Sequence, residues 1–348
     1  MECGGAASVD RVSTQRSADL VCEGGGVKGI GLVGAITALA EAGYRFPRVA
    51  GSSAGAIVGA LVAALQHAGE PLSRLEDIAK TIDYRKFADP GLLGRVPVIG
   101  APLSLLAFDG LYEGRYLEEF MTGVLAELGV RTFGDLRTGE ESSRYAYSLV
   151  VTASDLSARR LVRIPWDLPA YGADPDEFSV ARAVRASAAI PFVFTPVRVK
   201  GATWVDGGLL SNFPVDLFDR SDSLAPRWPT FGVRLTARAG TPPAIRRVQG
   251  PLSLGIAVLD TLFTNQDSAY VDDPCTVRRT VSCRPTVSAR SISGSGWRRR
   301  RTCTTRVWTL ECGSCGSGTS PITSPPAARP RSADSVAVHR ERGTRRIR

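Results

Sequence analysis

The residues with the clearest chemical potential form a G-x-S-x-G motif: Gly51, Ser52, Ser53, Ala54 and Gly55. This motif is typical of a serine held on a tight turn between a strand and a helix. The flanking glycines let the backbone take a strained path and leave room around the serine oxygen. The free N–H groups at the start of the following helix would face a developing oxyanion. We therefore predict that Ser53 is a nucleophile.

An earlier turn is rich in glycine and comprises Gly24, Gly25, Gly26, Val27, Lys28 and Gly29. Successive glycines let backbone N–H groups approach an anionic ligand, and Lys28 adds a positive charge. The turn also matches G-x-G-x-x-G, the dinucleotide-binding pattern. That pattern expects an acidic residue at a strand end about 20 residues on, where this chain has Arg45 and Arg48. This argues against a dinucleotide site, although a nucleotide-binding α/β module stays open as the alternative function.

The base that would serve Ser53 is not a histidine. The chain has two histidines. His67 lies about 20 Å along the helix that Ser53 begins, and His339 lies in the C-terminal tail. Asp206 is the best carboxylate, because it ends a predicted strand and is followed by Gly207 and Gly208. Its ordinary pKa is near 3.9, so it needs close contact with Ser53 and some desolvation to act as a base. The alternative is an ordinary Asp-Gly-Gly turn.

These residues need a framework of alternating strands and helices. Apolar patterns predict strands near 20–23, in the short run that leads into Gly51, and near 145–152, 160–164, 196–200, 202–205 and 230–235. They predict helices near 30–42, 56–64, 72–82, 114–129, 177–188 and 252–270. This alternation indicates an α/β sandwich with a largely parallel central sheet. The apolar residues of segment 89–108 have no regular spacing. The segment is either an irregular packed segment or an apolar lid that meets lipid.

The net charge of +9 belongs to the C-terminal end of the chain. From Cys275 to Arg348 there are 16 Arg, no Lys and 3 acidic residues, which leaves the rest mildly acidic. The basic pI is therefore poor support for specific nucleic-acid binding. We expect residues 1–17 and 282–348 to be disordered around a domain at 18–281. The tail is either a basic natural segment or out-of-frame translation, and its abrupt start favours the second.

The remaining composition predicts no anchor, metal or cofactor. No apolar run is long enough to span a membrane, and the N-terminus lacks the apolar region of a signal peptide. We expect a cytoplasmic protein, peripheral at most to a membrane; the alternative is export by a route with no visible signal. Cys312 and Cys315 have C-x-x-C spacing, but no second ligand pair accompanies them to form a zinc site.

Taken together, the motifs resemble the patatin-like phospholipases. The matching pieces are Gly24–Gly29, Gly51–Gly55 and Asp206–Gly208, in that order, with supporting similarity at 186–191 and 206–214. The resemblance covers roughly residues 18–281. It implies a three-layer sandwich and a lipid acyl hydrolase with a Ser-Asp dyad. In that dyad Ser53 is the nucleophile, Asp206 the base and Gly24–Gly29 the oxyanion hole.

The same resemblance implies a phospholipid or other acyl-ester substrate and transient membrane-surface contact. It implies no metal or cofactor, and no protein partner is predicted. The family normally continues past Val281 with a strand and a terminal helix, which this sequence does not show. A truncated, inactive member of the family is therefore a further alternative.

Overall fold

The computed structural model describes residues 16–25, 29–83, 86, 110–141, 144–220, 224–235, 248–265 and 274–283. Segment 89–108, most of the two expected disordered ends and residues 26–28 of the glycine-rich turn lie outside these residues. Arg16 and Ser17 form strand β1 (Arg16–Ser17), which pairs with β3 (Tyr44–Arg45). The expectation of disorder through residue 17 is thus wrong for these two positions, because β3 supplies backbone partners for them.

The central sheet is mixed, with a parallel core. Its order is β12-β11-β2-β4-β6-β10-β9, and β7 pairs with β6. The parallel strands are β12 (Thr280–Cys283), β11 (Thr230–Leu235), β2 (Asp19–Cys22), β4 (Val49–Gly51) and β6 (Leu149–Asp155). The antiparallel strands are β10 (Ala202–Asp206), β9 (Val197–Val199) and β7 (Arg160–Ile164). The prediction of an α/β fold with a sheet flanked by helices is confirmed.

Strand β12 corrects the expected end of the domain. The sequence shows no strand after Val281, but Thr280–Cys283 pairs in parallel with β11. Ser282 and Cys283 therefore belong to the sheet and not to the tail. A four-residue run carries little periodicity of its own, so its neighbour in the sheet decides its structure.

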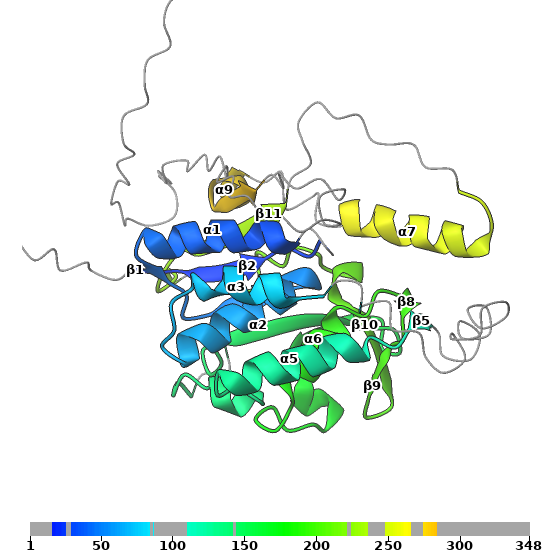
Figure 1. Ribbon diagram of the computed structural model, residues 1–348, viewed down its shortest axis with the longest axis horizontal. Coiled ribbons are helices and arrows are strands. Elements are labelled where there is room, and N and C mark those ends of the chain that lie inside the picture. The colour runs from blue at the N-terminus through cyan, green and yellow to red at the C-terminus, as the bar shows by residue number, and fades with distance from the viewer. Residues whose placement is uncertain are drawn as a thin grey trace, which may run out of the picture.

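Helices pack on one face of the sheet. They are α1 (Ile30–Glu41), α2 (Ala54–His67), α3 (Arg74–Thr81), α5 (Arg115–Glu127) and α6 (Val180–Ser187). Figure 1 shows α1, α3, α2 and α5 following one another across the molecule. Apolar side chains of these helices form one core with alternate residues of the strands, such as Leu20, Val49 and Leu149. This burial is the main source of the fold's stability.

The opposite face is covered differently in the described residues. Phe213, Val215, Leu217 and Phe218 pack there on Val21, Ala50 and Val150, the strand residues that point away from the helices. These four residues come from the irregular segment that follows β10. Among the described residues, this segment thus covers part of the second face of the sheet, and it also carries the chain away from Asp206.

A short pair of strands and a helix lie beside the end of β10. Strand β8 (Phe192–Phe194) pairs with β5 (Gly110–Tyr112), and helix α7 (Pro251–Asn265) packs on β8 and on the turn Gly207–Leu209. Figure 1 shows α7 in yellow beside this edge of the fold. The short helix α9 (Pro274–Arg278) precedes β12. Among the helices that the structure describes, none combines the length and the hydropathy needed to cross a membrane.

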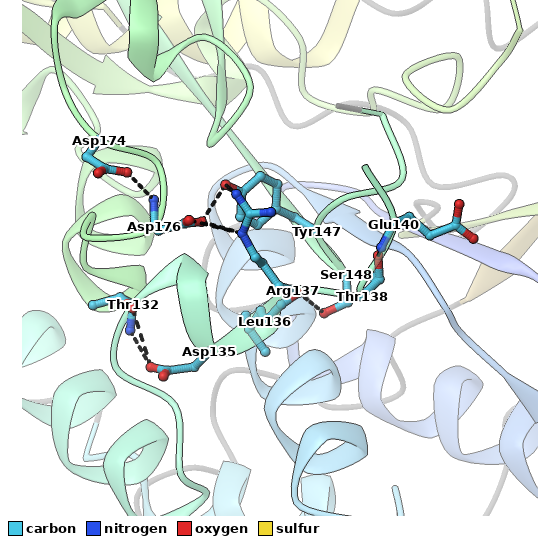
Figure 2. Close-up of polar contacts among 10 residues, drawn as sticks. All are labelled: Thr132, Asp135, Leu136, Arg137, Thr138, Glu140, Tyr147, Ser148, Asp174 and Asp176. Carbon is cyan, nitrogen blue, oxygen red and sulfur yellow. Dashed lines mark hydrogen bonds and ion pairs between the residues drawn. The ribbon is translucent and has the colours of Figure 1, made fainter. Parts of the chain in front are cut away.

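Two polar clusters connect elements of the fold at a distance from α7. The buried guanidinium of Arg48 is paired with Asp19 at the start of β2. Figure 2 shows a second cluster, in which Arg137 and Tyr147 both point at Asp176. Both clusters link segments that are distant in sequence, so they help to set how the elements meet.

Candidate active site

The turn that carries Ser53 has the geometry expected of its motif. Strand β4 ends at Gly51, α2 begins at Ala54, and Ser53 between them has φ 52° and ψ −121°. A positive φ is uncommon for a non-glycine residue, and such strain persists only where the surroundings hold it. A Cβ on Gly51 would lie 2.2 Å from the Gly55 oxygen, and one on Gly55 would lie 2.3 Å from the Cys22 oxygen. Both glycines are therefore required by close backbone approach.

The Ser53 hydroxyl is in contact with the predicted carboxylate. Ser53 Oγ donates a hydrogen bond of 2.7 Å to Asp206 Oδ2. Asp206 ends β10, next to β6, which in turn lies next to β4. This strand order brings together two residues that are 153 positions apart. His67, at the far end of α2, is exposed.

Burial sets the protonation behaviour of the carboxylate. Asp206 is 1% exposed, and desolvation raises the pKa of its carboxyl to about 7. The hydrogen bonds from Ser53 and from the Gly208 N–H, at 2.8 Å, oppose this rise because they stabilise the ionised form. A group with a pKa near neutrality can both accept and return a proton at physiological pH.

The described ends of the glycine-rich turn lie against the other two motifs. Gly24 donates its N–H to the Asn212 carbonyl oxygen at 2.8 Å, six residues past Asp206. A Cβ on Gly29 would lie 2.9 Å from the Cβ of Ala54. Gly25 is exposed, and Gly26, Val27 and Lys28 lie outside the described residues. The three motifs therefore meet beside the carboxyl ends of β2 and β4.

Three polar residues of the site, Thr152, Ser187 and Asn212, are not among the site residues that the sequence predicts. Ser52 Oγ donates to the Ser211 carbonyl oxygen at 2.6 Å and is also hydrogen-bonded to Thr152 Oγ1. Ser187 Oγ accepts the Ser53 N–H, and Asn212 Nδ2 donates to the Gly24 oxygen. Ser187 and Asn212 fall in the two supporting stretches of the resemblance, which is the one signal that could have found them. Thr152 sits in an apolar strand pattern with no such signal.

The described residues contain no group of three or more His, Cys, Asp or Glu side chains placed to hold a metal ion. Cys22 is fully buried in β2. The polar side chains described at the site are thus hydroxyls, the Asn212 amide and the Asp206 carboxylate. Such a set suits proton transfer and nucleophilic attack.

Comparisons with known proteins identify a matching family model and several relatives. The family model for patatin-like phospholipase matches residues 20–219. The uncharacterized protein YqhO of Bacillus subtilis is 37% identical over 263 residues, which cover 73% of this chain and 82% of that protein. The uncharacterized NTE family protein Rv2565 of Mycobacterium tuberculosis is 30% identical over 202 residues, or 58% of this chain and 28% of its own length.

Among solved structures, VipD from Legionella pneumophila is 18% identical, with a TM-score of 0.42. That alignment covers 78% of this chain and 61% of the Legionella chain. The chain thus spans less than two thirds of VipD and of the mycobacterial relative, but most of the Bacillus protein. The family-model match extends over more than half of the sequence, so the chain belongs to the patatin-like phospholipase family.

Proposed function

We propose that this chain is a serine lipid acyl hydrolase in which Ser53 is the nucleophile and Asp206 the general base. One observation carries the proposal: the buried hydrogen bond of 2.7 Å between Ser53 Oγ and Asp206 Oδ2. A serine hydroxyl needs an adjacent base to attack a carbonyl. Asp206 is that base here, and its raised pKa suits proton transfer near neutral pH.

In the first half of the reaction, Ser53 Oγ attacks the acyl carbonyl carbon and its proton passes to Asp206. The carbonyl oxygen becomes an oxyanion. As the oxyanion collapses, the ester C–O bond breaks and Asp206 gives its proton to the leaving alcohol oxygen. In the second half, Asp206 takes a proton from water, which attacks the acyl-serine. The proton returns to Ser53 Oγ as the fatty acid leaves, so protons balance over the cycle.

The oxyanion is stabilised by backbone N–H groups beside the carboxyl ends of β2 and β4. The contacts of Gly24 and Gly29 with the other two motifs support a position of the Gly24–Gly29 turn beside Ser53. The start of α2 adds the positive end of a helix dipole. Donors of this kind typically contribute about 10²- to 10³-fold each to the rate. Lys28 adds a positive charge to the same turn.

An apolar stripe beside the site favours a lipid substrate presented at a membrane surface. Leu254, Val258 and Leu262, spaced four residues apart on α7, are 55%, 50% and 41% exposed. The same helix packs on the turn that follows Asp206, where Phe263 approaches Gly208. Exposed apolar side chains that line one helix face next to a site are typical of surfaces that meet lipid.

Labelling with a fluorophosphonate tests the dyad. The reagent phosphonylates activated serines, and mass spectrometry locates the adduct. We expect an adduct on Ser53 that is absent in Ser53→Ala and strongly slowed in Asp206→Asn. Ser73→Ala, which changes an exposed serine before α3, is the matched control and should label normally. Full labelling of Ser53→Ala would refute the proposal.

Two substrates test the lipid assignment. Leu254→Asp/Leu262→Asp should hydrolyse phospholipid vesicles at least about 10-fold more slowly, because the stripe can no longer enter the interface. Hydrolysis of a soluble short-chain ester should be unchanged. Val277→Asp, at another exposed apolar position on α9, is the control. Equal rates of vesicle hydrolysis for the wild type, Leu254→Asp/Leu262→Asp and Val277→Asp would contradict contact through α7.

A further inference from the structure

The C-terminal end of α6 touches both members of the dyad. Ser187, the last residue of α6, is fully buried, and its Oγ accepts the Ser53 N–H at 2.9 Å. Two residues later, the Ala189 carbonyl oxygen accepts the Asp206 N–H at 2.9 Å. One short segment thus holds the backbone of the nucleophile and the backbone of the base.

The contact from Ser187 falls on the strained residue of the site. Ser53 has φ 52°, a conformation that L-residues with a side chain rarely adopt. Its Oγ reaches Asp206 only while the turn keeps this shape. A buried hydroxyl that accepts the N–H of the strained residue fixes the turn and satisfies a donor that would otherwise be buried without a partner.

We propose that Ser187 is a positioning residue for acyl transfer, holding Ser53 in the conformation that aims its hydroxyl at Asp206. This inference rests on the proposed function. The Ser53 N–H is committed to Ser187, so the oxyanion takes its hydrogen bonds from other N–H groups.

Helix α6 provides its own control for a purely structural role. Ser179, at the N-cap of the same helix, accepts the Arg182 N–H at 3.3 Å. Both serines therefore accept a backbone N–H with a side-chain oxygen, one at each end of α6. Ser179 stabilises the helix, whereas the partner of Ser187 is the nucleophile itself. Loss of Ser179 should weaken the fold and spare the chemistry.

The test compares Ser187→Ala with Ser179→Ala, using a soluble short-chain ester and fluorophosphonate. We expect Ser187→Ala to lower kcat and the rate of Ser53 labelling by about 10- to 100-fold, since small misplacements of a reacting group cost this much. KM should change less than about threefold. Ser179→Ala should keep the wild-type kcat and lower Tm.

The outcomes separate this inference from the proposed function. Wild-type kcat and labelling in Ser187→Ala, with Ser53→Ala inactive, would overturn the role of Ser187 alone. Activity retained in Ser53→Ala would overturn the dyad and this role together. An equal loss of kcat in Ser179→Ala and Ser187→Ala would assign both serines to the fold and also overturn the inference. Should Ser187→Ala not fold, Ser187→Cys, whose sulfur is a weak acceptor, gives the same comparison.

Discussion

Gly24 and Asn212 meet so closely that position 24 has no room for a side chain. The Gly24 N–H donates to the Asn212 carbonyl oxygen at 2.8 Å, and Asn212 Nδ2 donates to the Gly24 oxygen at 3.3 Å. A Cβ added to Gly24 would lie 2.2 Å from Asn212 Oδ1. The pair joins the start of the glycine-rich turn to the segment that follows Asp206.

Replacing Gly24 with alanine should therefore impair catalysis. The new methyl group would push the Asn212 side chain away and shift the glycine-rich turn that we propose as the oxyanion hole. We expect Gly24→Ala to lower kcat/KM for a soluble ester by about 10²-fold, the effect of losing one oxyanion donor. Steady-state kinetics measure this directly.

A double variant tests whether this steric conflict is the cause. Asn212→Ala removes the atom that the new methyl group would meet, so Gly24→Ala/Asn212→Ala should be more active than Gly24→Ala alone. Gly123→Ala is the control for glycine replacement. Gly123 lies in α5 with nothing within 4 Å of the added Cβ, so this change should leave activity intact. A double variant no more active than Gly24→Ala would contradict the steric explanation.

The raised pKa of Asp206 predicts how activity depends on pH. A general base works in its ionised form, so kcat/KM for an uncharged ester should rise with pH and level off above a midpoint near 7. Asp206→Asn should lose about 10²- to 10⁴-fold of the rate together with this midpoint. A midpoint that persists in Asp206→Asn would assign the titration to another group.

The same shift has a consequence for stability, with a definite sign. The folded protein holds the Asp206 proton up to a pH of about 7, whereas the unfolded chain releases it near the ordinary value of 3.8. Between these values the folded state binds more protons, so this residue's contribution to the free energy of unfolding falls as pH rises. Relative to the wild type, Asp206→Asn should therefore gain more free energy of unfolding at pH 8 than at pH 4. Urea denaturation at both pH values measures the difference, and an equal effect at both would contradict burial of the ionised carboxylate.

Local patterns were enough to predict the turn of Ser53 and the elements around it. The G-x-S-x-G motif and the apolar runs lie within a few residues of one another, so they predict β4 and α2 directly. Asp206 could also be proposed, because the lack of a usable histidine narrows the choice of base. The catalytic roles of both residues stay predictions until they are tested.

Contacts between distant segments could not be predicted in this way. Ser187 meets Ser53 across 134 positions, and Asn212 meets Gly24 across 188. Such pairings depend on which strands become neighbours, and no local pattern encodes that order. Strand β12 illustrates the same limit, since Thr280–Cys283 becomes a strand through its pairing with β11.

The buried pair of Arg48 and Asp19 predicts a large loss of stability on removal of one partner. Arg48 Nε donates to Asp19 Oδ1 at 2.9 Å, and the guanidinium lies 4.2 Å from the centre of the Tyr145 ring. Burial raises the pKa of Asp19, and Arg48 opposes the rise. Arg48→Met would leave the carboxylate buried without its cation, at a cost of about 3–5 kcal/mol. Chemical denaturation measures this cost.

Removing the second charge as well should restore much of that stability. Arg48→Met/Asp19→Asn removes both charges of this pair, so it should be more stable than Arg48→Met alone. The exposed pair of Arg227 and Glu140 is the control, and Arg227→Ala should cost less than about 1 kcal/mol. Equal losses for the buried and the exposed pair would refute this account.

The cluster in Figure 2 predicts an unusual titration of one phenol. The Tyr147 hydroxyl donates to Asp176 Oδ1 at 2.6 Å, and burial together with this carboxylate raises the pKa of Tyr147 to about 12. NMR of the chain with ¹³C-labelled tyrosine rings, assigned with Tyr147→Phe, should show this ring ionising well above the ordinary value of 10. Asp176→Asn should lower the pKa, because the nearby negative charge is gone. An unchanged midpoint in that variant would leave burial as the sole cause of the shift.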